Sequence, residues 1–183
     1  MTTWKPILVF DFETTGLTLH PDAPPEAQPR AIEFGGVYLN PEDGSVVVEF
    51  EFLIDPLVTI EPVITKITGI TNDMLAGQPS WYESAQKLTA IFSAASCAVA
   101  HNLPFDKAIL SHENKRNGTF VPFPEKQFCT LELYRQAWGK DMKLTALYES
   151  VCGRKLEQKH RGLSDVLALA DIIRHDRLYE IMR

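Results

Sequence analysis

A run of apolar residues that ends in two acids constrains the fold of this chain more than any other feature. Residues 7–13 read ILVFDFE, and such a run is typical of a strand buried on both faces of a sheet. Asp11 and Glu13 stand two residues apart, so both carboxylates leave the same face of the strand. Two carboxylates on an otherwise apolar strand are costly unless positive charge meets them. The alternative is that they lie at the exposed end of the strand as ordinary solvated acids.

The segments that follow predict an antiparallel meander. Residues 18–30 contain four prolines and few apolar side chains, which predicts an irregular surface loop. Residues 31–40 and 45–54 are expected to be strands, and the PEDG sequence at 41–44 predicts a hairpin turn between them. These two strands, together with 7–13, would form the three strands of the meander.

Beyond residue 56 the apolar residues take the three-and-four spacing of helices. The expected helices are 61–67, 81–94, 104–116, 130–138, 143–152 and a last helix from 162 almost to 183. Residues 97–102 are expected to be a short buried strand. The sequence therefore predicts an α/β fold over residues 1–183, a single domain whose mixed central sheet is flanked by helices. This sheet would consist of the antiparallel three-strand meander followed by parallel strands.

Charge and cysteine content exclude several classes of protein. The net charge is −6, which argues against nonspecific coating of nucleic acid but not against an enzyme whose metal ions supply positive charge locally. The three cysteines have no CxxC spacing, so neither a disulfide framework nor a zinc site is indicated. No apolar run approaches the ~20 residues of a membrane span, and the first residues do not resemble a secretory signal. We therefore expect a cytoplasmic protein without a membrane partner.

Two further acids stand where helices are expected to begin. Asp106 ends the sequence HNLPFD at 101–106, and Asp165 ends HRGLSD at 160–165. An acid in the first turn of a helix is favoured by the helix dipole and needs no function. Together with the strand acids, however, these residues could converge at one end of the sheet. Four carboxylates suit two Mg²⁺ or Mn²⁺ ions, and a pair of ions ~4 Å apart can assist displacement at a phosphodiester.

Four motifs, in this order, resemble those of the DEDDh family of 3′–5′ exonucleases, which includes the proofreading epsilon subunit of bacterial DNA polymerase III. They are DFETTGL at 11–17, ITGIT at 67–71, HNLPFD at 101–106 and HRGLSD at 160–165. The resemblance covers nearly the whole chain. It implies a ribonuclease-H-like fold in which residues 1–183 form one exonuclease domain.

The resemblance also implies roles for individual residues. The metal-ligating carboxylates would be Asp11, Glu13, Asp106 and Asp165, holding two Mg²⁺ or Mn²⁺ ions per site. His160 would be the general base that activates water. The related tyrosine subfamily has its tyrosine where this chain has Arg161, so the sequence falls on the histidine side.

Residues that would contact the substrate follow from the same resemblance. They are Thr14, Thr15, Gly16, Leu17, Ile70, Thr71, Asn102 and Phe105. Leu17 could wedge against a base or be a core leucine, Phe105 could be helix core, and the turn at 69–71 could simply end a helix. Basic residues near His160 could contact phosphate or form a solvated loop; these are Arg154, Lys155, Lys159 and Arg161. We interpret His101 as a strand-end histidine rather than a ligand.

The activity implied is hydrolysis of terminal phosphodiesters at single-stranded or unpaired DNA 3′ ends, releasing nucleoside 5′-monophosphates. The alternatives are an exoribonuclease that trims RNA 3′ ends and a non-catalytic scaffold that binds nucleic acid. Recognition of the 2′-hydroxyl would separate DNA from RNA, and no residue of the sequence settles it. The chain ends with its last expected helix, without the extension by which the polymerase subunit holds its polymerase. A stable polymerase partner is therefore not expected.

Overall fold

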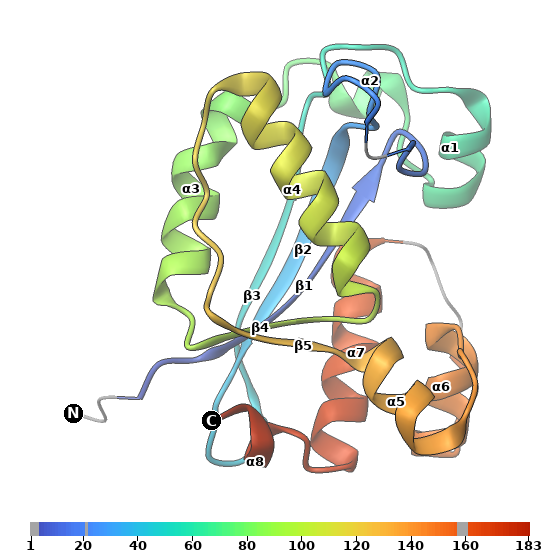
Figure 1. Cartoon of the computed structure of the whole chain (residues 1–183). Helices are drawn as coiled ribbons and strands as arrows, with labels where there is room; N and C mark the ends of the chain where they lie inside the picture. The colour runs from blue at the N-terminus through green and yellow to red at the C-terminus, as the bar shows by residue number, and fades with distance from the viewer. Residues whose placement is uncertain (1–3, 21, 157–160) are drawn as a thin grey trace.

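The computed structural model describes residues 4–20, 22–156 and 161–183, which form one five-stranded mixed sheet with helices on both faces (Figure 1). The strands are β1 (Ile7–Thr14), β2 (Ala31–Leu39), β3 (Val46–Leu53), β4 (Cys97–Ala100) and β5 (Lys126–Cys129). Their order across the sheet is β3-β2-β1-β4-β5. The first three strands pair antiparallel, whereas β4 runs parallel to β1 and β5 parallel to β4. The expected meander followed by parallel strands is confirmed.

The helices agree with the expected ones except for α2, which was not expected, and for the helices near the C-terminus. They are α1 (Pro62–Thr68), α2 (Asn72–Leu75), α3 (Trp81–Ala94), α4 (Leu103–Asn117), α5 (Thr130–Trp138), α6 (Leu144–Cys152), α7 (Gly162–His175) and α8 (Tyr179–Met182). The expectation of one helix from 162 almost to 183 is wrong. Arg177 has a left-handed φ of 56°, and the Leu178 N–H donates to the Ile173 carbonyl at 2.8 Å, which closes the end of α7.

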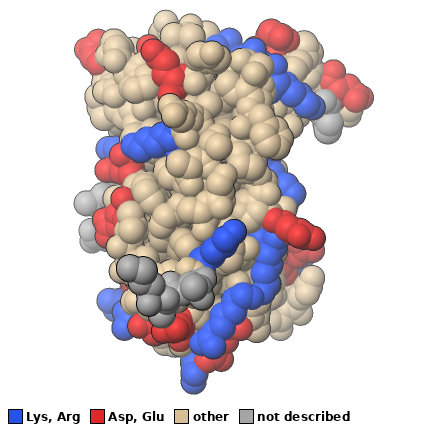
Figure 2. Space-filling view, turned by 90° about the vertical axis from the view of Figure 1, so that its left-hand side faces the viewer, with Lys and Arg blue, Asp and Glu red and all other residues tan. Residues whose placement is uncertain are grey.

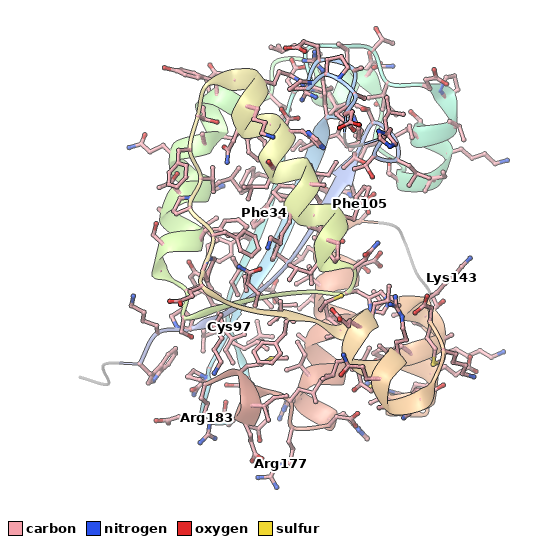
Figure 3. All side chains as sticks on the ribbon, viewed as in Figure 1. Phe34, Cys97, Phe105, Lys143, Arg177 and Arg183 are labelled. Carbon is pink, nitrogen blue, oxygen red and sulfur yellow. The ribbon has the colours of Figure 1, made fainter. Side chains whose placement is uncertain are left out.

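Strand β1 divides its side chains between two cores. Leu8, Phe10 and Phe12 pack in the core that α3 and α4 cover, together with Phe34, which is labelled in Figure 3. Ile7 and Val9 pack instead in the core formed with α6 and α7. Because side chains alternate along a strand, residues 11 and 13 continue the second set. Both acids of β1 therefore face the α7 side of the sheet.

The start of α7 lies directly on β2. A Cβ atom added to Gly35 would come within 2.1 Å of the Gly162 carbonyl carbon, so only two glycines allow this approach. The same contact brings Gly162 near the Asp11 carbonyl oxygen, 3.5 Å from where a Cβ of Gly162 would lie. The first turn of α7 is thereby held beside the carboxyl-terminal half of β1.

A smaller core places α1 and α2 at the carboxyl end of β1, at the top of Figure 1. It is formed by Ile32, Ile60, Ile70 and Leu75, with Ile64 partly buried against it.

On the side of the molecule that carries α3, uncharged surface covers the middle and charged side chains surround it (Figure 2). Within the described ranges, no helix is long and apolar enough to cross a bilayer.

Candidate active site

A cavity of about 390 Å³ opens where β1 ends, between α1 and the first turns of α4 and α7. Its lining residues are Asp11, Phe12, Glu13, Thr14, Gly16, Leu17, Ile64, Ile67, Thr68, Phe105 and Asp165. Three of the four carboxylates expected from the sequence thus line one cavity, although Asp165 is more than 150 residues from β1 in the chain. Figure 3 shows Phe105 at the start of α4, close to the end of β1.

The fourth carboxylate, Asp106, lies against β1 behind this cavity. Its side chain is 1% exposed, and Oδ1 accepts the Phe12 N–H at 3.0 Å. Phe12 stands between the two acids of β1, so this bond ties the first turn of α4 to the segment that carries them. The structure therefore brings all four acids into one neighbourhood.

Burial and mutual repulsion make these carboxylates hard to ionise. Burial, followed by the charges of Asp165 and Glu33, raises the pKa of Asp11 to about 7. Burial and the charges of Asp11, Asp165 and Glu33 raise the pKa of Glu13 to about 8, against a smaller lowering by Arg161. Burial, then the charge of Asp11, also holds the pKa of Asp106 well above its ordinary value. Such a cluster favours the binding of protons or cations.

The donor chemistry of the cluster fits a divalent cation. Carboxylate oxygens are the ligands that Mg²⁺ and Mn²⁺ prefer, and a cation would relieve the repulsion that raises these pKa values. In the described part of the chain, however, no three acidic, histidine or cysteine side chains already form a ready-made cation site.

A partly buried ion pair next to the cluster was not predicted from the sequence. Arg161, expected among residues that contact phosphate, instead directs its guanidinium to Glu33, which is fully buried on β2. Glu33 is the one acid within the otherwise apolar strand AIEFGGVYL. That pattern is a usable signal, because a buried acid requires a partner.

Five of the eight residues expected to contact substrate line one of two neighbouring cavities. Thr14, Gly16, Leu17 and Phe105 line the main cavity, and the Leu17 side chain is 83% exposed. Thr15 lines a neighbouring cavity of about 290 Å³, which also reaches Gly16 and Leu17. Three lining residues of α1 were not predicted; they are Ile64, Ile67 and Thr68. The signal for two of them was the ITGIT motif at 67–71, which contains Ile67 and Thr68.

The other three expected contacts do not line the main cavity. Ile70 is fully buried in the small core beneath α1 and α2. The Thr71 hydroxyl accepts the Met74 N–H at 3.2 Å and thereby caps α2. Asn102 is exposed at the residue before α4. For Ile70 and Thr71, a structural partner accounts for the side chain.

The structure describes His101, Arg154 and Lys155, whereas His160 and Lys159 lie outside the described residues. His101 has both ring nitrogens engaged, with Thr130 Oγ1 at 3.1 Å and the Met142 carbonyl at 2.9 Å, as expected of a strand-end histidine. Arg154 bonds the Tyr148 hydroxyl at 2.8 Å and pairs with Asp171, while Lys155 is exposed.

A five-stranded mixed sheet with a cluster of carboxylates at the end of its central strand defines a nuclease of the ribonuclease-H-like class. The family model described as exonuclease, RNase_T, matches residues 8–173, and the chain belongs to this DnaQ-like exonuclease family.

Individual relatives agree with this assignment. The chain is 34% identical over 167 residues to a PolC-type DNA polymerase III of Clostridium perfringens, a match that covers 91% of the chain and 11% of the relative. It is 30% identical over 160 residues to the 3′-5′ exonuclease DinG of Bacillus subtilis, covering 86% of the chain and 16% of that protein. The chain thus spans only a small part of these relatives.

The fold is shared with a solved nuclease. The nuclease domain of 3′hExo, a DEDDh family member bound to rAMP, superposes with a TM-score of 0.79 at 20% identity. This likeness covers 99% of the chain and 95% of that domain. The ribonuclease-H-like fold is therefore confirmed.

Proposed function

We propose that residues 1–183 form an exonuclease domain that removes nucleotides from the 3′ end of single-stranded or unpaired DNA and releases nucleoside 5′-monophosphates. The observation that carries this proposal is the meeting of Asp11, Glu13 and Asp165 in one cavity, with Asp106 bonded behind it. Family membership supports the reaction class.

In this proposal, Asp11, Glu13, Asp106 and Asp165 would hold two Mg²⁺ or Mn²⁺ ions. When bound, such cations supply positive charge that stabilises the attacking and leaving oxygens of a phosphodiester displacement. The carboxylates contribute by giving up protons that their raised pKa values otherwise retain. Metal binding should therefore release protons into the solution near neutral pH.

The other residues would act directly on water and substrate. His160 would accept a proton from the attacking water, since an unperturbed histidine with a pKa of ~6.5 is largely neutral above pH 7. Leu17 and Phe105 present apolar side chains in the cavity that the carboxylates line and would pack against the terminal base. Neither contact reads the identity of a base, so digestion should depend little on sequence.

DNA is the favoured substrate, and RNA is the alternative. The PolC-type relative is a DNA polymerase by name, which supports DNA. The DEDDh nuclease with the same fold was solved with a ribonucleotide, so an RNA arm belongs in the test.

The test is digestion of matched 5′-labelled DNA and RNA oligonucleotides with Mg²⁺, Mn²⁺ or EDTA. We expect a ladder of shortened DNA that requires the cation, slower digestion of RNA, and intact closed circular single-stranded DNA. Asp11→Asn is the matched inactive variant and should lower the rate by more than the ~100-fold that loss of a supporting residue costs a metal site. Cleavage of the circle, undiminished activity in EDTA or an active Asp11→Asn enzyme would each overturn the proposal.

A further inference from the structure

A fifth carboxylate, that of Glu33, lies beside the four expected from the motifs. Glu33 is on β2 directly opposite Glu13 in the β1–β2 register, and its side chain is fully buried. Its charge contributes to the raised pKa values of both Asp11 and Glu13, so it lies within electrostatic reach of the cluster. A further buried carboxylate at this place is costly unless other groups hold it.

The two oxygens of Glu33 are already engaged by the chain itself. Oε1 accepts from Arg161 Nε at 2.9 Å and from Nη2 at 2.5 Å. Oε2 accepts the Gly162 backbone N–H at 2.8 Å and lies 3.2 Å from Arg161 Nε. A guanidinium fork and a backbone amide thus satisfy this carboxylate.

These bonds hold the first turn of α7. Arg161 immediately precedes the helix, and its carbonyl accepts the Asp165 N–H at 3.1 Å. Gly162, the other partner of Glu33, is the residue that packs on Gly35 of β2. Asp165 projects from the same turn into the cavity that Asp11 and Glu13 line. Along the chain, His160 is the residue directly before Arg161.

We propose that Glu33 is a positioning residue of the exonuclease site: its bonds to Arg161 and to the Gly162 amide set where Asp165 enters the cavity. This inference rests on the proposed function. Residues that orient metal ligands typically change metal affinity or activity by about 10–100-fold when replaced. The competing view is that the ion pair only satisfies the buried Glu33 carboxylate. It would then contribute to stability and have no effect on the position of Asp165.

The first test is Glu33→Gln, which keeps the size of the side chain but removes its charge. We expect the dissociation constant for Mn²⁺, measured by calorimetry, to rise about 10–100-fold. The rate constant kcat for a single-stranded DNA oligonucleotide should fall by a similar factor, while KM changes little because Glu33 does not line the cavity. An unchanged Mn²⁺ dissociation constant would overturn the proposal.

Arg161→Lys provides a second variant that keeps the positive charge. Lysine cannot form the two-pronged contact that arginine makes, so Asp165 should be held less accurately even though the net charge is unchanged. We expect weaker Mn²⁺ binding and a lower kcat in a folded protein. If Glu33→Gln does not fold, this variant decides the question, and wild-type Mn²⁺ affinity in it would contradict the proposal.

Two controls separate positioning from stability. Glu51→Gln removes the weaker partner of the same guanidinium, 3.5 Å away and partly exposed, and should leave Mn²⁺ binding unchanged. Glu113→Gln breaks a more deeply buried ion pair, Glu113–Arg116, and should lower the unfolding temperature without weakening Mn²⁺ binding. Equal losses of Mn²⁺ affinity in Glu113→Gln and Glu33→Gln would show that lower stability explains the effect, and they would overturn the inference.

The outcomes also distinguish this inference from the proposed function. A wild-type protein that digests DNA and binds Mn²⁺, with a Glu33→Gln variant that does both equally well, removes only the positioning role. A wild-type protein that binds Mn²⁺ but digests neither DNA nor RNA removes the proposed function. The calorimetric comparison of Glu33→Gln with wild type then still tests whether Glu33 positions Asp165.

Discussion

At the scale of single residues, the four motif acids share one cluster but differ in their surroundings. Asp11, Glu13 and Asp165 line the cavity, whereas Asp106 is buried behind it and bonded to the β1 backbone. The proposed role of His160 is chemically different, because it would handle a proton rather than hold a cation.

The separate role of His160 leads to a kinetic prediction. His160→Ala should lower the single-turnover rate by about 10²–10⁴-fold, the usual contribution of a general base. Mn²⁺ affinity should change little, because carboxylates supply the hard oxygen ligands. Asp165→Asn is the matched comparison and should lose both the rate and Mn²⁺ affinity. If calorimetry shows that His160→Ala loses Mn²⁺ as completely as Asp165→Asn, His160 is a ligand instead.

That the four acids lie close together could be predicted from the sequence, because each belongs to a short motif with a chemical reason for its residue types. The Glu33–Arg161 pair could not, because it depends on the β1–β2 register and on the place where α7 meets β2. Ile70 illustrates the opposite error. It lies in a motif, yet only the packing of α1 and α2 shows that its side chain points into a core.

At the scale of elements, α7 depends on the absence of two side chains where it crosses β2. Gly35→Ala would place a Cβ 2.1 Å from the Gly162 backbone, which cannot move aside like a flexible side chain. We expect a loss of roughly 1–3 kcal/mol in the free energy of unfolding, as for other overpacked sites. Denaturation in urea measures it.

Gly16→Ala is the matched control for Gly35→Ala. A Cβ at Gly16 meets nothing within 4 Å, so the free energy of unfolding should stay within about 0.5 kcal/mol of wild type. Only stability is compared, since Gly16 lines the cavity. Equal stability of the two variants would show that α7 can shift on β2 at little cost.

A second element contact fixes the proline-rich loop to α4. Arg116 pairs with Glu113 at 2.7 Å, with both side chains less than 10% exposed, and donates to the carbonyls of Pro25, Gln28 and Pro29. Glu113 in turn accepts the Ala31 N–H at 2.9 Å, at the start of β2. The loop is therefore anchored to α4 at its C-terminal end, which its composition alone did not predict.

Breaking this anchor should lower the free energy of unfolding substantially. Arg116→Met leaves Glu113 buried without its cationic partner, and such losses cost about 3–5 kcal/mol. Urea denaturation should show this loss, whereas Arg177→Met, which removes an exposed pair with Glu180, should change stability little. A double variant, Glu113→Gln with Arg116→Met, should recover part of the loss. Similar stabilities of Arg116→Met and Arg177→Met would contradict the anchoring role.

The strands and longer helices were predictable because their apolar spacing is sustained over many residues. Elements β5 and α2 were missed because each has only four residues and neither is a continuous apolar run like the one that predicted the equally short β4. The last helix was overextended because its apolar residues continue into α8. The break between them is a backbone turn at Arg177, and arginine carries no turn signal.

At the scale of the whole molecule, the clustered acids make the stability of the cation-free protein depend on pH. The folded-state pKa values of Asp11 and Glu13 are raised to about 7 and about 8. Groups with raised pKa values bind more protons in the folded state, so their contribution to stability is complete below the unfolded pKa values. It is lost as pH rises from about 4 through the folded values.

The expected measurement is a thermal unfolding series in EDTA between pH 5 and pH 8.5. The unfolding temperature should fall toward high pH, by roughly 2–4 °C for each kcal/mol lost in a chain of this size. Mn²⁺ should raise it most at pH 8.5, where the ligands are ionised. The double variant Asp11→Asn with Glu13→Gln should flatten the profile in EDTA. A wild-type profile in EDTA no steeper than that of the double variant would contradict the raised pKa values.

The acids of the cluster come from positions 11, 13, 106 and 165, close to the start, middle and end of the 183-residue sequence. During synthesis, the first two leave the ribosome long before the last one exists. A nascent or prematurely terminated chain that stops before α7 therefore lacks both Asp165 and the surface that closes the cavity. Under the proposed function, such incomplete products should be unable to cut nucleic acid.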